Sequence, residues 1–170
     1  MTARAPSLIT LRKPTLADQG EFLALARASR ALHQPWVTAP LTPQQFTHYL
    51  ASMEGAAHCA LCVCERKSSS VVGVVNITHI VLGKFCSAYL GYYVFAGFER
   101  QGYMREGLQA AAQYAFTKLK LHRLEANIQP DNLASIALVK ACGFAKEGYS
   151  PRYLKIGSQW QDHERWAVVA

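Results

Sequence analysis

The stretch that most constrains this chain is a strand-like run followed by a polar loop and a helix. Residues 88–95 are apolar and fit a buried strand, and a helical pattern runs from about Gly102 to Lys118. The connecting segment, residues 100–108, reads Arg-Gln-Gly-Tyr-Met-Arg-Glu-Gly-Leu. A glycine turn at a helix start leaves backbone N–H groups free to bind an anion, and the helix dipole favours negative charge there. The segment therefore predicts a metal-free pyrophosphate site and a phosphate-bearing cofactor.

Length and composition predict one domain with a substantial core. The 170 residues fit a single domain, taken as 1–170, and a hydrophobic content of 51% argues against disorder. No apolar run approaches the roughly 18 residues of a membrane span, and the first residues do not fit a secretion signal. We therefore expect a cytoplasmic protein. The five cysteines then fit reduced thiols.

Net charge gives a weaker indication of partners. The chain carries 18 basic and 11 acidic residues, a formal net charge of +7, which favours acidic partners in general. The phosphates of a cofactor, ribosomal RNA or solubility alone could each account for it. Because the basic residues are scattered along the chain, no direct nucleic-acid role is expected.

Three cysteines, Cys59, Cys62 and Cys64, could suggest a metal cluster. In a strand, however, Cys59 points to the opposite face from the other two. No second Cys-x-x-Cys pair is present. We expect them to be small apolar residues of a buried strand, and we expect no metal.

The order of elements predicts a mixed sheet with helices on both faces. Capping boxes at Thr15-Leu-Ala-Asp18 and Thr42-Pro-Gln-Gln45 begin helices expected to run to about Ser29 and Gly55. A loop with two prolines separates them, and a last helix begins at Asp131 or Asn132 and stops before Gly143. Strands are expected at 9–12, 59–65, 71–80, 88–95, 123–128, 144–149 and 164–169. The fold class is α/β (α+β), with a mostly antiparallel central sheet of about seven strands.

These features resemble the GNAT superfamily of N-acetyltransferases along nearly the whole chain. The acetyl-CoA loop of that family has the pattern Gln/Arg-x-x-Gly-x-Gly/Ala. Gly102 matches its central glycine, whereas Glu99 and Met104 depart from the pattern. Asn132, followed by a helix that ends at Gly143-Phe144, resembles the second family motif.

Within the superfamily, the chain most resembles the Rim-type ribosomal-protein N-acetyltransferases, especially the alanine-specific branch. The resemblance depends on several short pieces taken together in their order and spacing. They are Pro35-Trp36, His122-Arg123, Lys-Glu-Gly-Tyr at 146–149, Tyr153-Leu154 and Trp-Gln-Asp-His at 160–163.

This resemblance implies acetyl-CoA as co-substrate and direct acetyl transfer to an amine in a ternary complex. Backbone N–H groups in the loop would hold the pyrophosphate. The two loop arginines would add charge, unless they are solvated surface residues. The strand before the loop would pair with the pantetheine amides and polarise the thioester oxygen, unless it is an ordinary buried strand. The expected cofactor-binding residues are Tyr92, Tyr93, Val94, Arg100, Gln101, Gly102, Tyr103, Met104, Arg105, Asn132 and Ser135.

The expected catalytic residues are Ser135 and Asn127. Many relatives have a catalytic tyrosine where this chain has Val139. Ser135, one turn into the same helix, is the nearest hydroxyl and is expected to hydrogen-bond the CoA sulfur, unless it is only a first-turn helix hydroxyl. Asn127 stands where relatives carry a glutamate base. It can orient a water or the substrate but is a poor base.

The missing base favours an acceptor that loses its proton easily. A protein α-amine has a pKa of about 7.7–8.0, against about 10.4 for lysine. General-base assistance contributes roughly 10²–10⁴ in rate, which a lysine would need more. An N-terminal α-amine is therefore the expected acceptor, with Trp36, Tyr149 and Tyr153 lining its groove.

Alternatives remain open at this point. The acceptor could be a small amine, or the chain could be a CoA-binding module that has lost its chemistry. Glu106 is expected to favour the helix dipole, and Glu125 to form an ion pair. His163 is expected to be structural. An edge strand near the C-terminus could form a homodimer.

Overall fold

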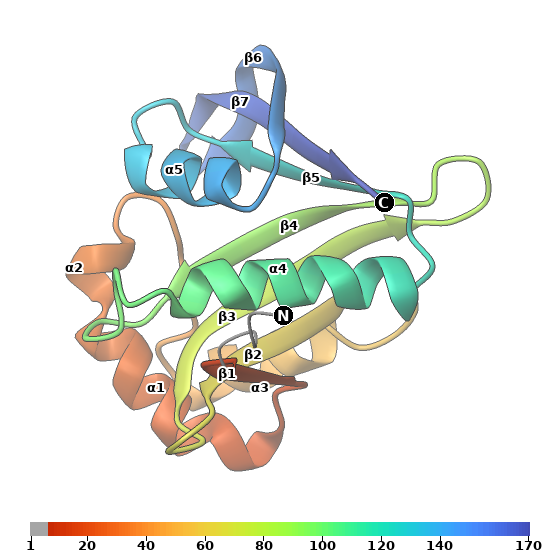
Figure 1. Cartoon of the computed structure of the whole chain (residues 1–170). Helices are drawn as coiled ribbons and strands as arrows, with labels where there is room; N and C mark the ends of the chain where they lie inside the picture. Colours follow the sequence, from red (N-terminus) through yellow and green to blue (C-terminus); the bar gives the residue numbers. More distant parts are fainter. Residues whose placement is uncertain (1–6) are drawn as a thin grey trace.

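The chain folds around a seven-stranded sheet with the strand order β1-β2-β3-β4-β5-β7-β6 (Figure 1). The structure, a computed structural model, describes residues 7–170. Neighbouring strands are antiparallel except for β4 and β5, which are parallel. The mixed, mostly antiparallel sheet is thus confirmed. The strands are β1 (Ile9–Arg12), β2 (Cys59–Glu65), β3 (Val71–Val81), β4 (Ser87–Val94), β5 (Arg123–Ile128), β6 (Ala145–Ile156) and β7 (Gln159–Val169).

Helices cover both faces of the sheet, as expected. A short 3-10 turn, η1 (Leu16–Asp18), precedes α1 (Gln19–Ala28), and α2 (Arg30–His33) and α3 (Pro43–Ser52) follow. The core on their side is separate from the core under α4 (Tyr103–Thr117) and α5 (Leu133–Ala141). Figure 1 shows α4 lying across one face, with α1 and α3 towards the other. No helix in the described part of the chain is long and apolar enough to cross a membrane.

Strand β2 confirms the interpretation of the cysteines. Cys59 lies in the core beneath α4, whereas Cys62 and Cys64 lie in the core on the other face. Burial raises the pKa of the Cys62 thiol to about 12, so this side chain stays neutral and apolar in character. Within residues 7–170, no group of three or more His, Cys, Asp or Glu side chains is arranged to hold a metal ion.

Both predicted capping boxes are present. The Thr42 hydroxyl accepts a hydrogen bond from the Gln45 N–H (3.2 Å), and Pro43 occupies the first turn. At the other box, the Thr15 N–H donates to Asp18 Oδ2 (2.7 Å). Asp18 also receives two hydrogen bonds from the Arg12 guanidinium, at 2.6 and 2.8 Å, although only Asp18 is buried. This pair ties β1 to the start of the first helix.

Replacing Asp18 by asparagine is expected to lower the free energy of unfolding by about 1–2 kcal/mol at pH 7. The hydrogen bonds from Arg12 lower the pKa of the Asp18 carboxyl below its ordinary value. Its stabilisation is therefore complete above the unfolded-state pKa of about 3.9 and disappears as the pH falls through the lower folded-state pKa. Urea unfolding of both proteins between pH 7 and pH 2 measures this, and the difference should shrink below about pH 4. A difference that stays constant over that range would contradict the assignment.

Close packing positions α4 on the sheet. A Cβ at Gly107 would lie 2.7 Å from a Val63 methyl group, and one at Gly73 would lie 2.4 Å from Met104 Sδ. These glycines let the helix approach β2 and β3 more closely than any larger residue would allow. The N-terminal end of α4, and the loop before it, are held against the sheet as a result.

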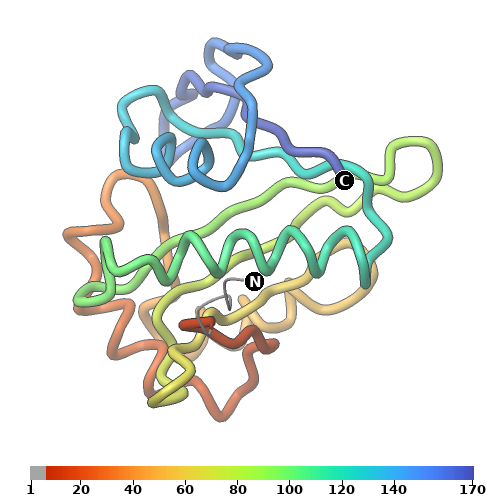
Figure 2. The backbone as a smooth tube through the Cα atoms, viewed as in Figure 1, coloured from red at the N-terminus to blue at the C-terminus, as the bar shows by residue number. Residues whose placement is uncertain are grey.

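Strands β4 and β5 separate along their length. Their pairing is confined to Ser87, Ala88 and Tyr89 on β4, opposite Arg123, Leu124 and Glu125 on β5. Beyond that point β4 continues to pair with β3 as far as Val94, but no β5 partner faces it. The backbone trace in Figure 2 shows the two strands diverging. The end of β4 therefore has an unpaired edge on the side of β5, although β4 is a central strand of the sheet.

Two predicted boundaries were wrong. Residues 30–33 form α2 rather than part of a loop. The last two strands are much longer than 144–149 and 164–169, and form a hairpin whose turn contains Gly157. Beyond residue 149, β6 continues through Pro151 with an irregularity in its pairing, where Arg152 has a φ of 48°. The proline is tolerated because β6 is an edge strand, where a residue without an N–H need not leave a hydrogen bond of the sheet unmade. The homodimer through this edge stays a prediction.

Candidate active site

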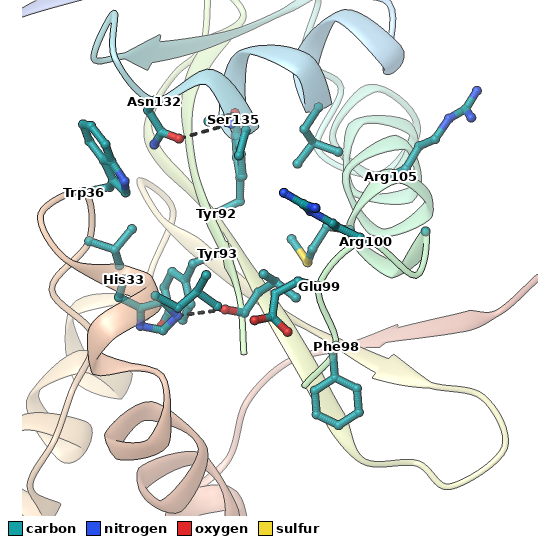
Figure 3. A pocket seen from close by; sticks show the side chains of 17 residues that line it. His33, Trp36, Tyr92, Tyr93, Phe98, Glu99, Arg100, Arg105, Asn132 and Ser135 are labelled. Atoms are coloured by element: carbon teal, nitrogen blue, oxygen red, sulfur yellow. Dashed lines mark hydrogen bonds between the residues drawn. The ribbon is translucent and has the colours of Figure 1, made fainter. Parts of the chain in front are cut away.

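Two adjoining cavities lie where β4 and β5 separate. The first, which we name the loop cavity, has a volume of about 510 Å³ and lies between β4, α2, the start of α5 and the loop before α4 (Figure 3). The second, the hairpin cavity, has a volume of about 460 Å³ and reaches the β6–β7 hairpin. Both are lined by Trp36, Val37, Tyr92, Asn132 and Ser135. These five residues therefore mark the junction of the two cavities.

The loop before α4 has the backbone of an anion site. Gly97, Arg100 and Gly102 adopt left-handed conformations, with φ of 93°, 59° and 86°. In the described structure, no protein acceptor pairs with the backbone N–H groups of residues 101–105. Unpaired amides at the start of a 15-residue helix are suited to a phosphate. The loop's conformation thus fits the predicted pyrophosphate site.

The two loop arginines differ in direction. Both line the loop cavity, but in Figure 3 the Arg100 side chain points towards its middle, whereas that of Arg105 points away from Arg100 at the first turn of α4. Gln101 and Tyr103 line neither cavity, because their side chains bond elsewhere. The Gln101 amide donates to the Gly97 carbonyl (2.7 Å), and the Tyr103 hydroxyl donates to Glu65. Gln101 and Tyr103 could therefore contact a ligand only through their backbone.

The end of β4 is held by a histidine that the sequence did not indicate. His33 is buried, and its Nε2–H donates to the Val94 carbonyl at 2.8 Å. Its ring also packs against Tyr93, with 4.9 Å between ring centroids. The Tyr93 hydroxyl is buried without a hydrogen-bond partner in the described structure. No local pattern could have indicated His33, because it lies 61 residues before Val94 in the chain.

Ser135 lies at the junction of the cavities with a partner of its own. The Asn132 side chain caps α5 by accepting the Ser135 N–H at 3.2 Å. The Ser135 Oγ lies 2.7 Å from the Tyr92 hydroxyl. Burial raises the pKa of Tyr92 far above its ordinary value, so its hydroxyl keeps its proton. The pair therefore forms a neutral hydroxyl chain that can donate one hydrogen bond into the junction.

The hairpin cavity is lined by Asn127 and by two of the three expected groove residues, Trp36 and Tyr153. Asn127 and Tyr153 line it, and the Asn127 Oδ1 is buried with no partner in the described structure. Trp36 lies at its boundary with the loop cavity. Tyr149 lines neither cavity, is 50% exposed, and donates its hydroxyl hydrogen bond to Asp162 at 2.5 Å.

The described lining of the hairpin cavity contains no carboxylate. Of the described residues that line it, none is Asp, Glu, Lys or Arg. Glu125 forms an ion pair with Arg123 (2.8 Å), and Glu106 Oε2 accepts hydrogen bonds from the Ser7 hydroxyl and the Leu8 N–H, both at 2.8 Å. Glu125 thus forms the ion pair that the sequence favoured, whereas Glu106 joins α4 to the residues just before β1. The cavity is polar but uncharged.

The sequence of this chain is similar to those of known acetyltransferases. Residues 9–145 match the family model described as Acetyltransferase (GNAT) domain. Bacillus subtilis "Probable N-acetyltransferase YjcK" is 30% identical over 126 residues, which are 74% of this chain and 70% of that protein. The Escherichia coli [ribosomal protein uS5]-alanine N-acetyltransferase is 41% identical over 99 residues. That match covers 58% of this chain and about half, 51%, of the relative.

A solved structure confirms the fold. Mycobacterium smegmatis RimJ, in complex with CoA-disulfide, superimposes with a TM-score of 0.88 at 23% identity. The superposition covers 95% of this chain and 82% of that one.

Proposed function

This chain belongs to the GNAT family of acetyl-CoA-dependent N-acetyltransferases, and on that premise we propose that its acceptor is the N-terminal α-amine of a protein, in particular a ribosomal protein. The observation that carries the proposal is the uncharged lining of the hairpin cavity. An amine must be neutral to attack a thioester, and an unpaired ammonium is costly in a site without a counter-charge. A weakly basic α-amine meets that condition far more easily than lysine does.

A polyamine acceptor fits this cavity less well. Spermidine carries several positive charges near neutral pH, and a site for it needs carboxylates to pair with those charges. The described lining of the hairpin cavity offers only amides, hydroxyls, two histidines and apolar groups. The 41% identity to an enzyme named for ribosomal protein uS5 supports the protein acceptor.

The cofactor side of the proposal uses the loop cavity. Acetyl-CoA supplies an activated acetyl thioester. The free N–H groups of residues 101–105 and the Arg100 guanidinium would hold its pyrophosphate, and the unpaired edge of β4 would bind its pantetheine amides. The side chains of Tyr93 and Met104 line this cavity as well.

The hydroxyl chain at the junction would serve the leaving group. When the acceptor nitrogen bonds to the carbonyl carbon, the C–S bond breaks and its electron pair stays on sulfur. We assign to Ser135 the hydrogen bond that stabilises this sulfur, with Tyr92 as the second donor behind it. Asn127 would accept a hydrogen bond from the acceptor nitrogen, because its Oδ1 has no protein partner in the described structure.

An acceptor panel tests the proposal. The enzyme and acetyl-CoA are incubated with a lysine-free peptide that begins with alanine, a matched peptide with a blocked N-terminus and one lysine, and spermidine. At pH 7 the first peptide is expected to gain one acetyl group, measured by intact mass, with kcat/KM at least about tenfold above the other two, because more of its amine is neutral. Faster transfer to lysine or to spermidine would refute the proposed acceptor.

A further inference from the structure

We propose that His163 is the general base of this enzyme: its Nε2 accepts the proton that the acceptor ammonium loses before attack. The inference rests on the proposed α-amine acceptor and assigns a role to a residue that the sequence indicated as structural. It also supplies the base that Asn127 cannot provide.

The position of His163 is the first argument. It lies on β7, is only 2% exposed, and lines the hairpin cavity together with Asn127 and Ser135. In the β5–β7 ladder Asn127 pairs with Arg165, and alternate residues of a strand share a face. His163 therefore lies diagonally across from Asn127 on the same side of the sheet. If His163 is the base and Asn127 the hydrogen-bond acceptor for the same amine, the two side chains must lie on one side of the sheet, as they do.

The hydrogen bond at the other ring nitrogen is the second argument. His163 Nδ1 lies 3.0 Å from the Gln161 carbonyl oxygen. A carbonyl oxygen can only accept, so Nδ1 carries the hydrogen and the neutral ring has its lone pair on Nε2. In the described structure no residue bonds to Nε2, and Nε2 is not among the buried atoms that lack a partner. The ring lines the hairpin cavity, so Nε2 is left without a protein partner beside it.

The surroundings of the ring are the third argument. Of the groups that line the hairpin cavity in the described structure, only His79, Tyr89, Tyr92, Tyr153 and His163 can titrate. The Tyr153 ring of β6 faces the imidazole at 6.2 Å between centroids. The neighbouring carboxylates on β7 bond elsewhere, Asp162 to Tyr149 and Glu164 to Lys146. Arg165, also on β7, lies against Gly148 of β6. The described lining of the cavity therefore offers no carboxylate to pair with the ring.

The proposed step balances as follows. The acceptor R–NH₃⁺ gives one proton to Nε2, and the neutral amine attacks the thioester carbonyl carbon. The C–N bond forms, the C–S bond breaks, and the electron pair goes to sulfur. A second proton leaves the nitrogen and reaches that sulfur through the Ser135 hydroxyl chain. The imidazolium then returns its proton to solvent, so that the products are the acetylated amine, CoA and one proton.

Ordinary pKa values favour this pairing with an α-amine. Imidazole has a pKa of about 6.5, which is within about 1.5 units of an α-ammonium group but about 4 units below lysine. An imidazole base therefore suits an N-terminal acceptor better than a lysine.

The variant His163→Asn tests the proposal, because its amide can keep the hydrogen bond to the Gln161 carbonyl while the base is lost. With the alanine peptide at pH 7, kcat/KM is expected to fall by about 10²-fold or more. The deficit should shrink as the pH rises towards 9, where the α-amine is already neutral. CoA affinity and the thermal midpoint should stay close to those of wild type. A second variant, His163→Gln, should give the same pH profile.

His58→Asn is the matched control, because His58 lines neither cavity. Its kcat/KM should stay within about threefold of wild type, since it removes no catalytic proton transfer. If both His163 variants keep at least half of the wild-type kcat/KM, or lose it equally at every pH, the base assignment is overturned.

Failure of the proposed function is a separate outcome. Should the wild-type enzyme prefer spermidine or lysine, the His163 variants are assayed with that acceptor. A deficit that shrinks as the pH approaches the pKa of that amine would still support His163 as the base, and a pH-independent deficit would overturn it.

Discussion

A Ser135→Ala variant is expected to lose about 10²-fold in the rate of acetyl transfer, with the affinity for acetyl-CoA changed by less than about threefold. Ser135 lies at the junction of the two cavities, 2.7 Å from the Tyr92 hydroxyl, and it is the one hydroxyl of the α5 first turn placed there. Removing it leaves the departing sulfur without its donor. Single-turnover kinetics with saturating acetyl-CoA measure the transfer step apart from product release.

Two neighbouring tyrosines provide the controls for this experiment. Tyr92→Phe removes only the second donor of the chain and should cost about tenfold, because Ser135 can still reach the sulfur. Tyr93→Phe removes a buried hydroxyl that has no partner in the described structure, so it should leave the rate unchanged and stabilise the fold slightly. Full activity in Ser135→Ala would show that solvent protonates the leaving group.

Replacing Arg100 by glutamate is expected to weaken CoA binding by about 100-fold at low ionic strength. The guanidinium reaches into the loop cavity beside the free N–H groups of residues 101–105. A charge-assisted hydrogen bond contributes about 1.5–3 kcal/mol, roughly 10- to 150-fold in affinity. Glutamate replaces that attraction by repulsion. The backbone at position 100 already holds a residue with a side chain at a φ of 59°. Replacing arginine by glutamate there therefore adds no new backbone strain. Calorimetric titration with CoA measures the loss.

Arg105→Glu is the comparison variant, since Arg105 also lines the loop cavity but its side chain points away from that of Arg100. Its effect on CoA affinity should stay below about fivefold and should vanish with added salt. Equal losses in both variants would mean that the overall charge of the loop, rather than the direction of Arg100, determines binding.

Local features of this protein could be predicted because their causes are local. The two capping boxes join residues three positions apart, and both formed as expected. The glycine at 102 begins α4 with the left-handed backbone that the loop motif requires. Alternation along β2 placed Cys59 on the correct face. The mixed, mostly antiparallel sheet of about seven strands, which the order of elements predicted, is confirmed.

Features that join distant segments could not be predicted in this way. The Tyr92–Ser135 pair spans 43 residues, and the hydrogen bond from His33 to Val94 spans 61. Neither leaves a periodic signal. The last two strands, predicted at 144–149 and 164–169, extend to 12 residues in β6 and 11 in β7. Their pairing into a hairpin, which the sequence did not indicate, brings Tyr153 and His163 to the hairpin cavity.

The amino-acid sequence by itself determined the donor half of this enzyme. A glycine-containing loop at a helix start binds phosphate through its own backbone, so a short local pattern is sufficient. The acceptor half was decided only by the tertiary structure. Its cavity is assembled from β3, β4, β5, the hairpin and the Trp36 loop, which meet because β4 and β5 separate. Whether that cavity carries charge, and which histidine nitrogen faces it, depends on contacts between residues far apart in the chain.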